Sequence, residues 1–388
     1  MVRLRSGFQQ INYLNSSEDV YIDMLLISLI GFAIALILSI GFTPLVRKLA
    51  FKVGAVDKPN ARKVHSRMMP RLGGLAIFAA FILTFPLISN SEYDKPNISL
   101  GLILGSIVIV IIGSLDDRFE LSAKWKLLGQ IVAASIVVSF GVQVNLLNLP
   151  FGEHMISIGW LSIPITILWI VGVTNAINLI DGLDGLAAGV SSIATGTILA
   201  LAIMMGNVYI ILLSSILLGS ILGFLVFNFH PAKIFMGDSG ALFLGFTLAT
   251  LSVLGFKQAT VISFIIPLLI LGVPISDTFF AILRRRITKT PISVADKGHL
   301  HHCLLRIGFS HRTTVLIIYG IATLFGLSAV LLSQSNLWLS IVLICLIILG
   351  IEVGGEMIGI MTKRRRPVLR FFRKVRIFAE QSKLLPPK

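Results

Sequence analysis

The sequence predicts an all-α integral membrane protein that crosses the bilayer about eleven times. Hydrophobic residues make up 55% of the 388 residues and charged residues only 13%, and the mean hydropathy is +0.92. A soluble chain needs more polar surface than this, and many apolar runs approach the ~20 residues that a helix needs to span a bilayer. The candidate spans lie near residues 24–44, 73–89, 98–115, 127–144, 160–176, 185–205, 208–227, 240–256, 260–282, 314–333 and 337–361.

The basic residues predict how these spans are oriented. When the loops are assigned alternately to the two sides, all but four of the 33 Lys and Arg fall on one side, the exceptions being Arg3, Arg5, Lys95 and Lys257. Because cytoplasmic loops carry an excess of Lys and Arg, the N-terminus is predicted outside and the C-terminus inside. The expected organisation is an extracytoplasmic segment 1–23, a transmembrane domain 24–361 with functional cytoplasmic loops, and a basic cytoplasmic tail 362–388.

The net charge of +15 is explained by the membrane. It is concentrated beside the span ends on one face, where it suits an anionic inner leaflet, so the expected partner is the lipid bilayer and no nucleic acid. The first apolar run is too long, and too basic at its far end, for a cleaved signal peptide, and we interpret it as a retained span. Cys303 and Cys345 fall in a cytoplasmic loop and a span, so no disulfide is expected.

One segment carries four polar side chains at steps of three residues: Asn175, Asn178, Asp181 and Asp184. An ionisable or amide group at membrane depth is costly unless it lines a polar cavity, which favours a functional site. Asn178 and Asp184 supply the oxygen atoms that hard cations such as Mg²⁺ prefer. Hydrogen bonding between helices would explain one such Asn, but it does not readily explain four polar residues together.

Two further segments place acidic residues at membrane boundaries. Asp116 and Asp117 are adjacent at a predicted helix end, shortly before Lys126. Crowded carboxylates raise one pKa or recruit a cation, and both outcomes serve phosphate chemistry, although a solvated acidic pair is the alternative. Asp238 lies in a Gly-Asp-Ser-Gly sequence before an apolar helix, where it can meet a metal and helix N–H groups. A helix N-cap alone would leave the glycines and the nearby Lys233 unexplained.

Two cytoplasmic loops complete a set of five segments, which all fall on the predicted cytoplasmic side and are expected to share one site. His299, His301 and His302 follow the ninth predicted span. A zinc site is incomplete without a Cys or acid at ligand spacing, and imidazoles beside a diphosphate fit better. The basic loop 57–74 could present backbone N–H groups to phosphate, but a positively charged turn is the preferred interpretation.

Together these segments resemble the polyprenyl-phosphate N-acetylhexosamine-1-phosphate transferase family. That family includes the bacterial WecA/TagO-type enzymes, the phospho-MurNAc-pentapeptide translocases and the eukaryotic GlcNAc-1-phosphate transferase. The resemblance covers about residues 24–360 and rests on Asp116-Asp117, Asn-x-x-Asn-x-x-Asp-Gly-x-Asp-Gly-Leu, Phe-Met-Gly-Asp-Ser-Gly and His-x-His-His, in that order. The histidine motif and the Asp-Lys-Pro-Asn loop resemble the WecA/TagO branch, with Leu300 where Ile is more usual.

The resemblance implies transfer of GlcNAc-1-phosphate from UDP-N-acetylglucosamine to undecaprenyl phosphate at the cytoplasmic face of a bacterial cell membrane. The products would be undecaprenyl-diphospho-GlcNAc and UMP. It also implies Mg²⁺, with Mn²⁺ as an alternative, on Asp238 and Asn178, and catalytic roles for Asp116, Asp117 and Lys126. The expected substrate-binding residues are Asn175, Asp181, Asp184 (a uracil contact), Lys233, His299, His301 and His302.

Other functions stay open. A member of the same family that uses UDP-MurNAc-pentapeptide would need a different specificity loop. A cation-coupled transporter would also place acids within the membrane, but it should show internal repeats and a midplane cluster, and we detect neither in the sequence. The resemblance further implies inhibition by tunicamycin, a product that initiates a cell-envelope polymer such as teichoic acid, and the homodimers that are common in the family.

Overall fold

The computed structural model describes residues 2–57, 68–88, 94–144, 146–148, 155–255, 265–290, 298–335 and 337–358. Two antiparallel strand pairs lie among the helices: β1 (Val56–Asp57) with β2 (Met69–Pro70), and β3 (Leu146–Asn148) with β4 (Met155–Ser157). A 3-10 turn, η1 (Gly159–Leu161), precedes α5. The α-helices in these ranges are α1 (Val2–Val53), α2 (Gly73–Ile88), α3 (Pro96–Phe119), α4 (Ala123–Ser139), α5 (Ser162–Ile180), α6 (Leu186–Met204), α7 (Val208–Asn228), α8 (Gly237–Gly255), α9 (Ile265–Ile270), α10 (Gly272–Thr288), α11 (Leu300–Ile307), α12 (His311–Gln334) and α13 (Leu337–Ile358).

Among the described residues, seven helical segments are long and apolar enough to cross a membrane. They are Ile22–Val53, Pro96–Phe119, Gly159–Ile180, Leu186–Met204, Val208–Asn228, Gly237–Gly255 and His311–Gln334. Shorter apolar helices occur at Gly73–Ile88 and Trp338–Ile351. The expected all-α, polytopic membrane architecture is therefore confirmed, whereas the number of eleven spans and their orientation remain predictions.

The ninth predicted span, 260–282, is interrupted rather than continuous where the structure describes it. α9 ends at Ile270 and α10 begins at Gly272. Pro274 has no N–H to donate to the Ile270 carbonyl, which removes one helical hydrogen bond at this point. The break lets α10 begin as a separate helix. This helix carries Asp277, which contacts residues 299–302, the segment that we call the histidine loop.

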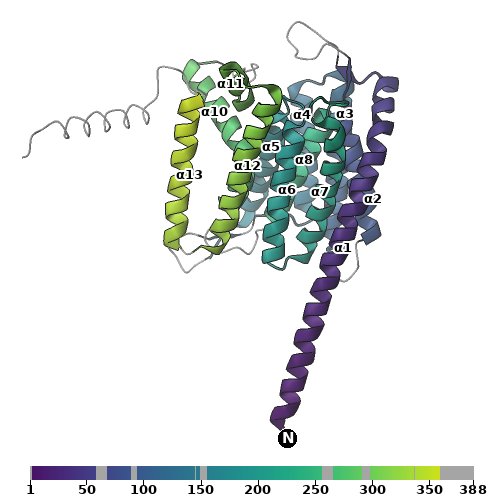
Figure 1. The fold of residues 1–388 in the computed structure, drawn as a ribbon, viewed down its shortest axis with the longest axis vertical. Coiled ribbons are helices and arrows are strands. Elements are labelled where there is room, and N and C mark those ends of the chain that lie inside the picture. Colours follow the sequence, from purple (N-terminus) through teal and green to yellow (C-terminus); the bar gives the residue numbers. More distant parts are fainter. Residues whose placement is uncertain are drawn as a thin grey trace, which may run out of the picture.

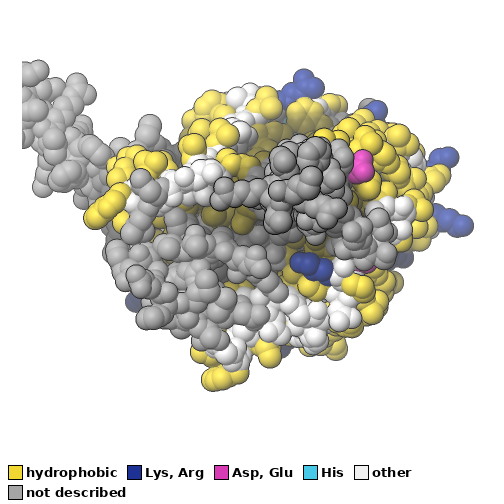
Figure 2. Space-filling view, turned by 90° about the horizontal axis from the view of Figure 1, so that it is seen from below, with side chains coloured by type: hydrophobic (Ala, Val, Ile, Leu, Met, Phe, Trp, Pro, Cys, Tyr) yellow, Lys and Arg dark blue, Asp and Glu magenta, His cyan; other side chains and the backbone are white. Residues whose placement is uncertain are grey.

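The helices form one upright bundle with α8 inside it and α1 and α13 near its edges (Figure 1). In the apolar stretch of α8, 94% of the residues are buried, whereas in the membrane-spanning part of α1 only 22% are buried. Seen from the end opposite α11, hydrophobic side chains cover much of the rim of the bundle (Figure 2). Exposed apolar residues such as Leu26, Leu168 and Leu324 fit contact with lipid.

The interior is tightly packed, with aromatic side chains in contact and hydroxyl groups that form hydrogen bonds within their own helices. Phe81 packs edge-on against Phe243, and both are buried. Buried hydroxyls such as those of Thr174 and Thr195 donate to the carbonyl four residues earlier in their own helices. These bonds avoid the cost of burying an unpaired hydroxyl group in an apolar medium. The polar residues that converge at one end of the bundle are of a different kind.

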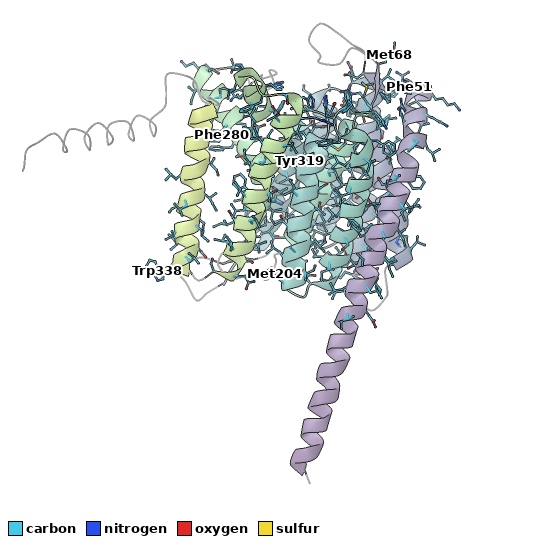
Figure 3. The ribbon with its side chains drawn as sticks, viewed as in Figure 1. Phe51, Met68, Met204, Phe280, Tyr319 and Trp338 are labelled. Atoms are coloured by element: carbon cyan, nitrogen blue, oxygen red, sulfur yellow. The ribbon has the colours of Figure 1, made fainter. Side chains whose placement is uncertain are left out.

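That end, which we call the α11 end, contains the α11 helix and the C-terminal end of α1 (Figure 1). Phe51 and Met68 lie there, whereas Met204 and Trp338 lie at the opposite end (Figure 3). The N-terminal end of α1 also lies on the far side, and α13 runs from the far side up to the α11 end. The first and last described helices therefore begin away from the α11 end and finish at it.

Candidate active site at the α11 end

Lys126 joins two carboxylates from different helices. Its Nζ lies 3.0 Å from Asp116 Oδ2, at the end of α3, and 2.8 Å from Asp238 Oδ2, at the start of α8. The side chains of Asp116 and Asp238 retain only 10% and 18% exposure, so their charges need a partner. The predicted grouping of Asp116, Lys126 and Asp238 is thus present as one ion-paired cluster, which we call the acidic cluster.

Asp117 holds the start of α8 in place. Its Oδ1 accepts the Asp238 N–H at 2.8 Å, and its Oδ2 accepts the Ser239 N–H at 3.0 Å. Gly237 has φ +71°, and a Cβ there would lie 2.5 Å from Asp117 Oδ2, so the glycine permits this approach. Asp117 therefore positions Asp238 through the backbone at the start of α8.

Asn178 and Asp181 bring the end of α5 to the acidic cluster. The Asn178 side chain lies against the Asp238 carboxylate. Asp181 is the C-cap residue of α5. Its burial, together with the negative charges of Asp238 and Asp117, raises the pKa of Asp181 to about 8. The site concentrates more negative charge than Lys126 offsets, a condition that favours cation binding.

Asp184 belongs to a second, adjacent cluster. Its Oδ2 accepts hydrogen bonds from His230 Nδ1 at 2.8 Å and from the Ala232 N–H at 3.1 Å. The His230 ring stacks on His311 with the centroids 4.2 Å apart. Ligand atoms of Asp184, His230 and His311 all lie within 4.8 Å of one another, so these residues could also hold a metal ion.

The histidine loop meets the Asn-Asp segment directly. His301 is buried, and a Cβ added at Gly182 would lie 2.5 Å from its Nε2. Burial and the neighbouring imidazoles, His302 foremost, lower the pKa of His301 to about 4, so this ring is neutral near pH 7. The rings of His301 and His302 lie 4.2 Å apart. The structure therefore joins two segments more than a hundred positions apart, as the predicted shared site requires.

Two predicted substrate-binding residues have other contacts. Asn175 exchanges hydrogen bonds with Gln130 of α4, its Nδ2 donating to Gln130 Oε1 at 2.6 Å. That pair ties α4 to α5, which is the structural use of an amide that the sequence left open. Lys233 is exposed, and its Nζ lies 5.8 Å from the centroid of the Phe227 ring. Neither geometry excludes a ligand contact, so both assignments stay predictions.

The loop before α2 has a structural role where it is described. The N–H groups of Gly73 and Gly74 donate to the carbonyls of Phe235 and Met236 at 3.0 and 2.9 Å, so they are not available to a phosphate. This agrees with the preferred interpretation of the loop as a turn. The positions from Lys58 to Arg67, including His65, lie outside the described residues.

Sequence reasoning missed three residues of this region. Asp277 of α10 contacts His299, and His230 and His311 complete the cluster of Asp184. Asp277 could have been found, because a lone acid in an apolar run of spanning length is itself a sign of a site. His230 and His311 are 81 positions apart in the sequence, and only the packing of α12 beside the α7–α8 connection brings them together.

The fold and this site define a polytopic membrane protein whose candidate active-site residues cluster at one end of a helical bundle. The model of glycosyl transferase family 4 matches residues 99–256. The chain is 45% identical over 347 residues to a "probable undecaprenyl-phosphate N-acetylglucosaminyl 1-phosphate transferase" of Bacillus subtilis. The aligned residues cover 89% of this chain and 96% of that protein. The chain belongs to this family.

Two further relatives show how the similarity extends. A decaprenyl-phosphate N-acetylglucosaminephosphotransferase of Mycobacterium tuberculosis is 38% identical over 76% of this chain and 79% of its own length. An undecaprenyl-phosphate alpha-N-acetylglucosaminyl 1-phosphate transferase of Escherichia coli is 32% identical over 85% of this chain and 89% of its own length. All three relatives are named for transfer to a polyprenyl phosphate.

Proposed function

We propose that this protein transfers GlcNAc-1-phosphate from UDP-N-acetylglucosamine to undecaprenyl phosphate, giving undecaprenyl-diphospho-GlcNAc and UMP. The observation that carries the proposal is the acidic cluster, in which Lys126 bridges Asp116 and Asp238 beside Asn178, in a chain with near full-length similarity to enzymes of that name. A lipid phosphate must approach a diphosphate, so two anions meet, and positioning and charge neutralisation supply most of the catalysis.

The residues of the acidic cluster fit a magnesium ion. Asp238 and Asn178 offer hard oxygen donors side by side, and the buried Asp116 Oδ1 has no hydrogen-bond partner among the described residues. Asp238 and Asn178 are the proposed ligands, with Mn²⁺ as the alternative ion. When bound, the cation would neutralise charge on the diphosphate of the donor and on the leaving UMP.

The chain's own residues would handle the phosphates. Lys126 is held between two carboxylates, where its ammonium group can also pair with phosphate oxygens. His301 lies against Gly182 with His302 beside it, and the neutral His301 can donate a hydrogen bond to a phosphate oxygen. These three groups would hold the two anions near one another, which is the main requirement of the reaction.

Asp116 is the proposed partner of the lipid phosphate. It lies near the end of α3, where its Oδ2 pairs with Lys126 and its Oδ1 has no hydrogen-bond partner among the described residues, so it can position the acceptor or accept its proton. An oxygen of the lipid phosphate would attack the phosphorus attached to the sugar, and the bond from that phosphorus to the UMP oxygen would break. A single in-line displacement accounts for these products without a phosphorylated residue.

The Asp184 cluster is the proposed nucleoside end of the donor site. Asp184 and His230 present hydrogen-bonding groups, and their side chains are about one-sixth and one-third exposed. Asp181 lies between Asn178 and Asp184 in the sequence. The donor would therefore extend from the base at Asp184 to the phosphates at Lys126 and His301. Asp181 would orient the intervening part.

We also propose that this site faces the cytoplasm of a bacterial cell. Lys52 and Arg71 flank it on neighbouring segments, and α10 ends in Arg284, Arg285 and Arg286. Basic residues gather on the cytoplasmic side of membrane proteins. UDP-sugars are made in the cytoplasm, and the product would initiate a cell-envelope polymer such as teichoic acid.

The test is release of UMP by the purified protein in detergent with undecaprenyl phosphate and UDP-N-acetylglucosamine, with and without Mg²⁺. We expect UMP only when lipid, donor and divalent cation are all present. Activity with UDP-MurNAc-pentapeptide but not with UDP-N-acetylglucosamine would move the chain to another branch of the family. Absence of UMP with every UDP-sugar would overturn the proposed reaction.

A further inference from the structure

The strongest feature outside the residues assigned so far is a buried pair between Asp277 and His299. Asp277 lies on α10 and is 4% exposed, and His299 precedes α11 and is 6% exposed. Asp277 Oδ2 lies 2.8 Å from His299 Nδ1. A buried carboxylate is costly unless it is paired, and His299 supplies one of the partners of Asp277.

Asp277 also anchors the start of α11. Its second oxygen, Oδ1, accepts the N–H of Leu300 at 2.7 Å. His299 occupies the N-cap position, but its own side chain makes no capping hydrogen bond. A carboxylate at a helix N-terminus is favourable because it accepts an unsatisfied N–H and meets the positive end of the helix dipole. Asp277 therefore fixes both the backbone and the ring at the beginning of the histidine loop.

The contact decides which nitrogen of His299 remains for the reactants. An ionised carboxylate has no hydrogen to donate, so His299 Nδ1 must carry the shared hydrogen. Nε2 is then the nitrogen that can accept a hydrogen bond from an O–H or N–H group of the substrate. Carboxylates that orient a functional imidazole in this way set both its tautomer and its direction.

The position of His299, fixed by Asp277, also bears on the neighbouring His301. The rings of His299 and His301 are nearly parallel, with an interplanar angle of 8° and centroids 6.0 Å apart. His301 in turn lies against Gly182 of the Asn-Asp segment. The other titratable groups facing this pair are His302 on α11 and His311 on α12, and Arg284 of α10 packs against Gly298.

We infer that Asp277 is a positioning residue for the transfer reaction: it holds His299 in the Nδ1–H form and fixes the start of α11, so that His299 Nε2 can accept a hydrogen bond from an O–H or N–H group of the bound donor substrate and His301 stays in place to donate to the donor phosphates. This inference rests on the proposed function, because it assigns the histidine loop to the phosphates. Asp277 itself touches no reactant.

The test compares Asp277→Asn with Thr278→Val in the UMP assay. An asparagine offers one acceptor oxygen where Asp277 uses two, so it loses either the His299 or the Leu300 bond whichever way it turns. We expect kcat to fall by about 10- to 100-fold, the range seen for residues that orient a functional histidine, with KM for UDP-N-acetylglucosamine changed less than kcat. Thr278→Val is the matched control, because Thr278 Oγ1 has no hydrogen-bond partner in the described structure.

A double-mutant cycle with His299→Gln separates positioning from simple stability. If Asp277 acts through His299, the double variant should lose no more activity than the worse single variant. Losses that multiply would overturn the proposal. So would a His299→Gln protein with full activity, and that result does not depend on whether Asp277→Asn folds.

Nitrogen NMR of protein labelled at histidine, assigned with the His299→Gln variant, provides a measurement that needs no turnover. The wild type should show hydrogen on His299 Nδ1, and Asp277→Asn should change that signal. A wild-type ring with hydrogen on Nε2 alone would overturn the inference. Because this spectrum needs no substrate, an inactive wild type would count against the proposed reaction and not against the Asp277–His299 contact.

Discussion

Lys126 and Asp238 form an ion pair with 2.8 Å between Nζ and Oδ2, although they are 112 positions apart in the sequence. The pair brings the start of α4 to the start of α8, and Asp117 reinforces the same junction by accepting the Asp238 and Ser239 N–H groups. A cation or a phosphate that arrives here meets groups that are already oriented. Little reorganisation is then needed at the moment of reaction.

The first prediction concerns the metal ligands. Asp238→Asn and Asn178→Ala should each raise the Mg²⁺ concentration needed for half-maximal UMP release by at least tenfold, because each removes a hard oxygen donor or weakens one. The measurement is a Mg²⁺ titration of initial rates at saturating donor and lipid. Asp94→Asn is a suitable control, since Asp94 precedes α3 at the other end of that helix and bonds to Ser99.

These variants must also be shown to be folded. Asp238 pairs with Lys126, so thermal unfolding in detergent should accompany each titration. Folded Asp238→Asn and Asn178→Ala proteins that turn over normally at low Mg²⁺ would remove both residues from the proposed metal site. An equal loss at all Mg²⁺ concentrations would assign them a role other than metal binding.

The second prediction concerns the acceptor. Asp116→Asn should lower kcat by about 100-fold, in line with the contribution of general acid–base groups, while binding of UDP-N-acetylglucosamine changes less than threefold. The reason is that Asp116 pairs with Lys126 in the acidic cluster, whereas the Asp184 cluster is the part of the site proposed for the nucleoside. Steady-state kinetics and direct donor binding make the comparison. A change confined to donor affinity would take Asp116 out of the catalytic step.

The sequence predicted the membrane fold and the convergence of the motifs because both follow from local patterns. Apolar runs locate helices, and the basic loops place the polar motifs on one side. The particular partners could not be predicted in the same way, because they depend on helix rotation and close packing. Asn175 faces Gln130, whereas Asn178, one helical turn later, reaches Asp238. The hydrogen bonds that Asp117 accepts from the start of α8 likewise depend on the packing of α8 against α3.

The third prediction uses the contact between Gly182 and His301. Gly182→Ala should lower the rate of UMP release by at least tenfold, because the added methyl group would come within 2.5 Å of His301 Nε2 and push the ring from its place. Gly172→Ala on α5 is the control, since a Cβ there meets nothing within 4 Å. The pair should show similar unfolding temperatures and different rates. Equal rates would mean that His301 does not need its observed position.

The final prediction concerns pH. In the folded, metal-free protein the pKa of Asp181 is raised from 3.8 to about 8, chiefly by burial and then by the charges of Asp238 and Asp117. Between pH 4 and 8 the folded state therefore keeps a proton that the unfolded state has released. Stability contributed by this group is complete below pH 4 and is lost as the pH rises toward 8, at up to about 1.4 kcal/mol per pH unit.

Asp181→Asn should remove this dependence, because the amide does not titrate. In EDTA, the unfolding temperature of the wild type should fall more steeply between pH 5 and 8.5 than that of Asp181→Asn, while Asp94→Asn should follow the wild type. Saturating Mg²⁺ should flatten the wild-type curve, since a cation at Asp238 offsets the negative charge that raises the Asp181 pKa. Parallel curves for the wild type and Asp181→Asn would show that Asp181 is already ionised, and that the acidic cluster tolerates its charge without a cation.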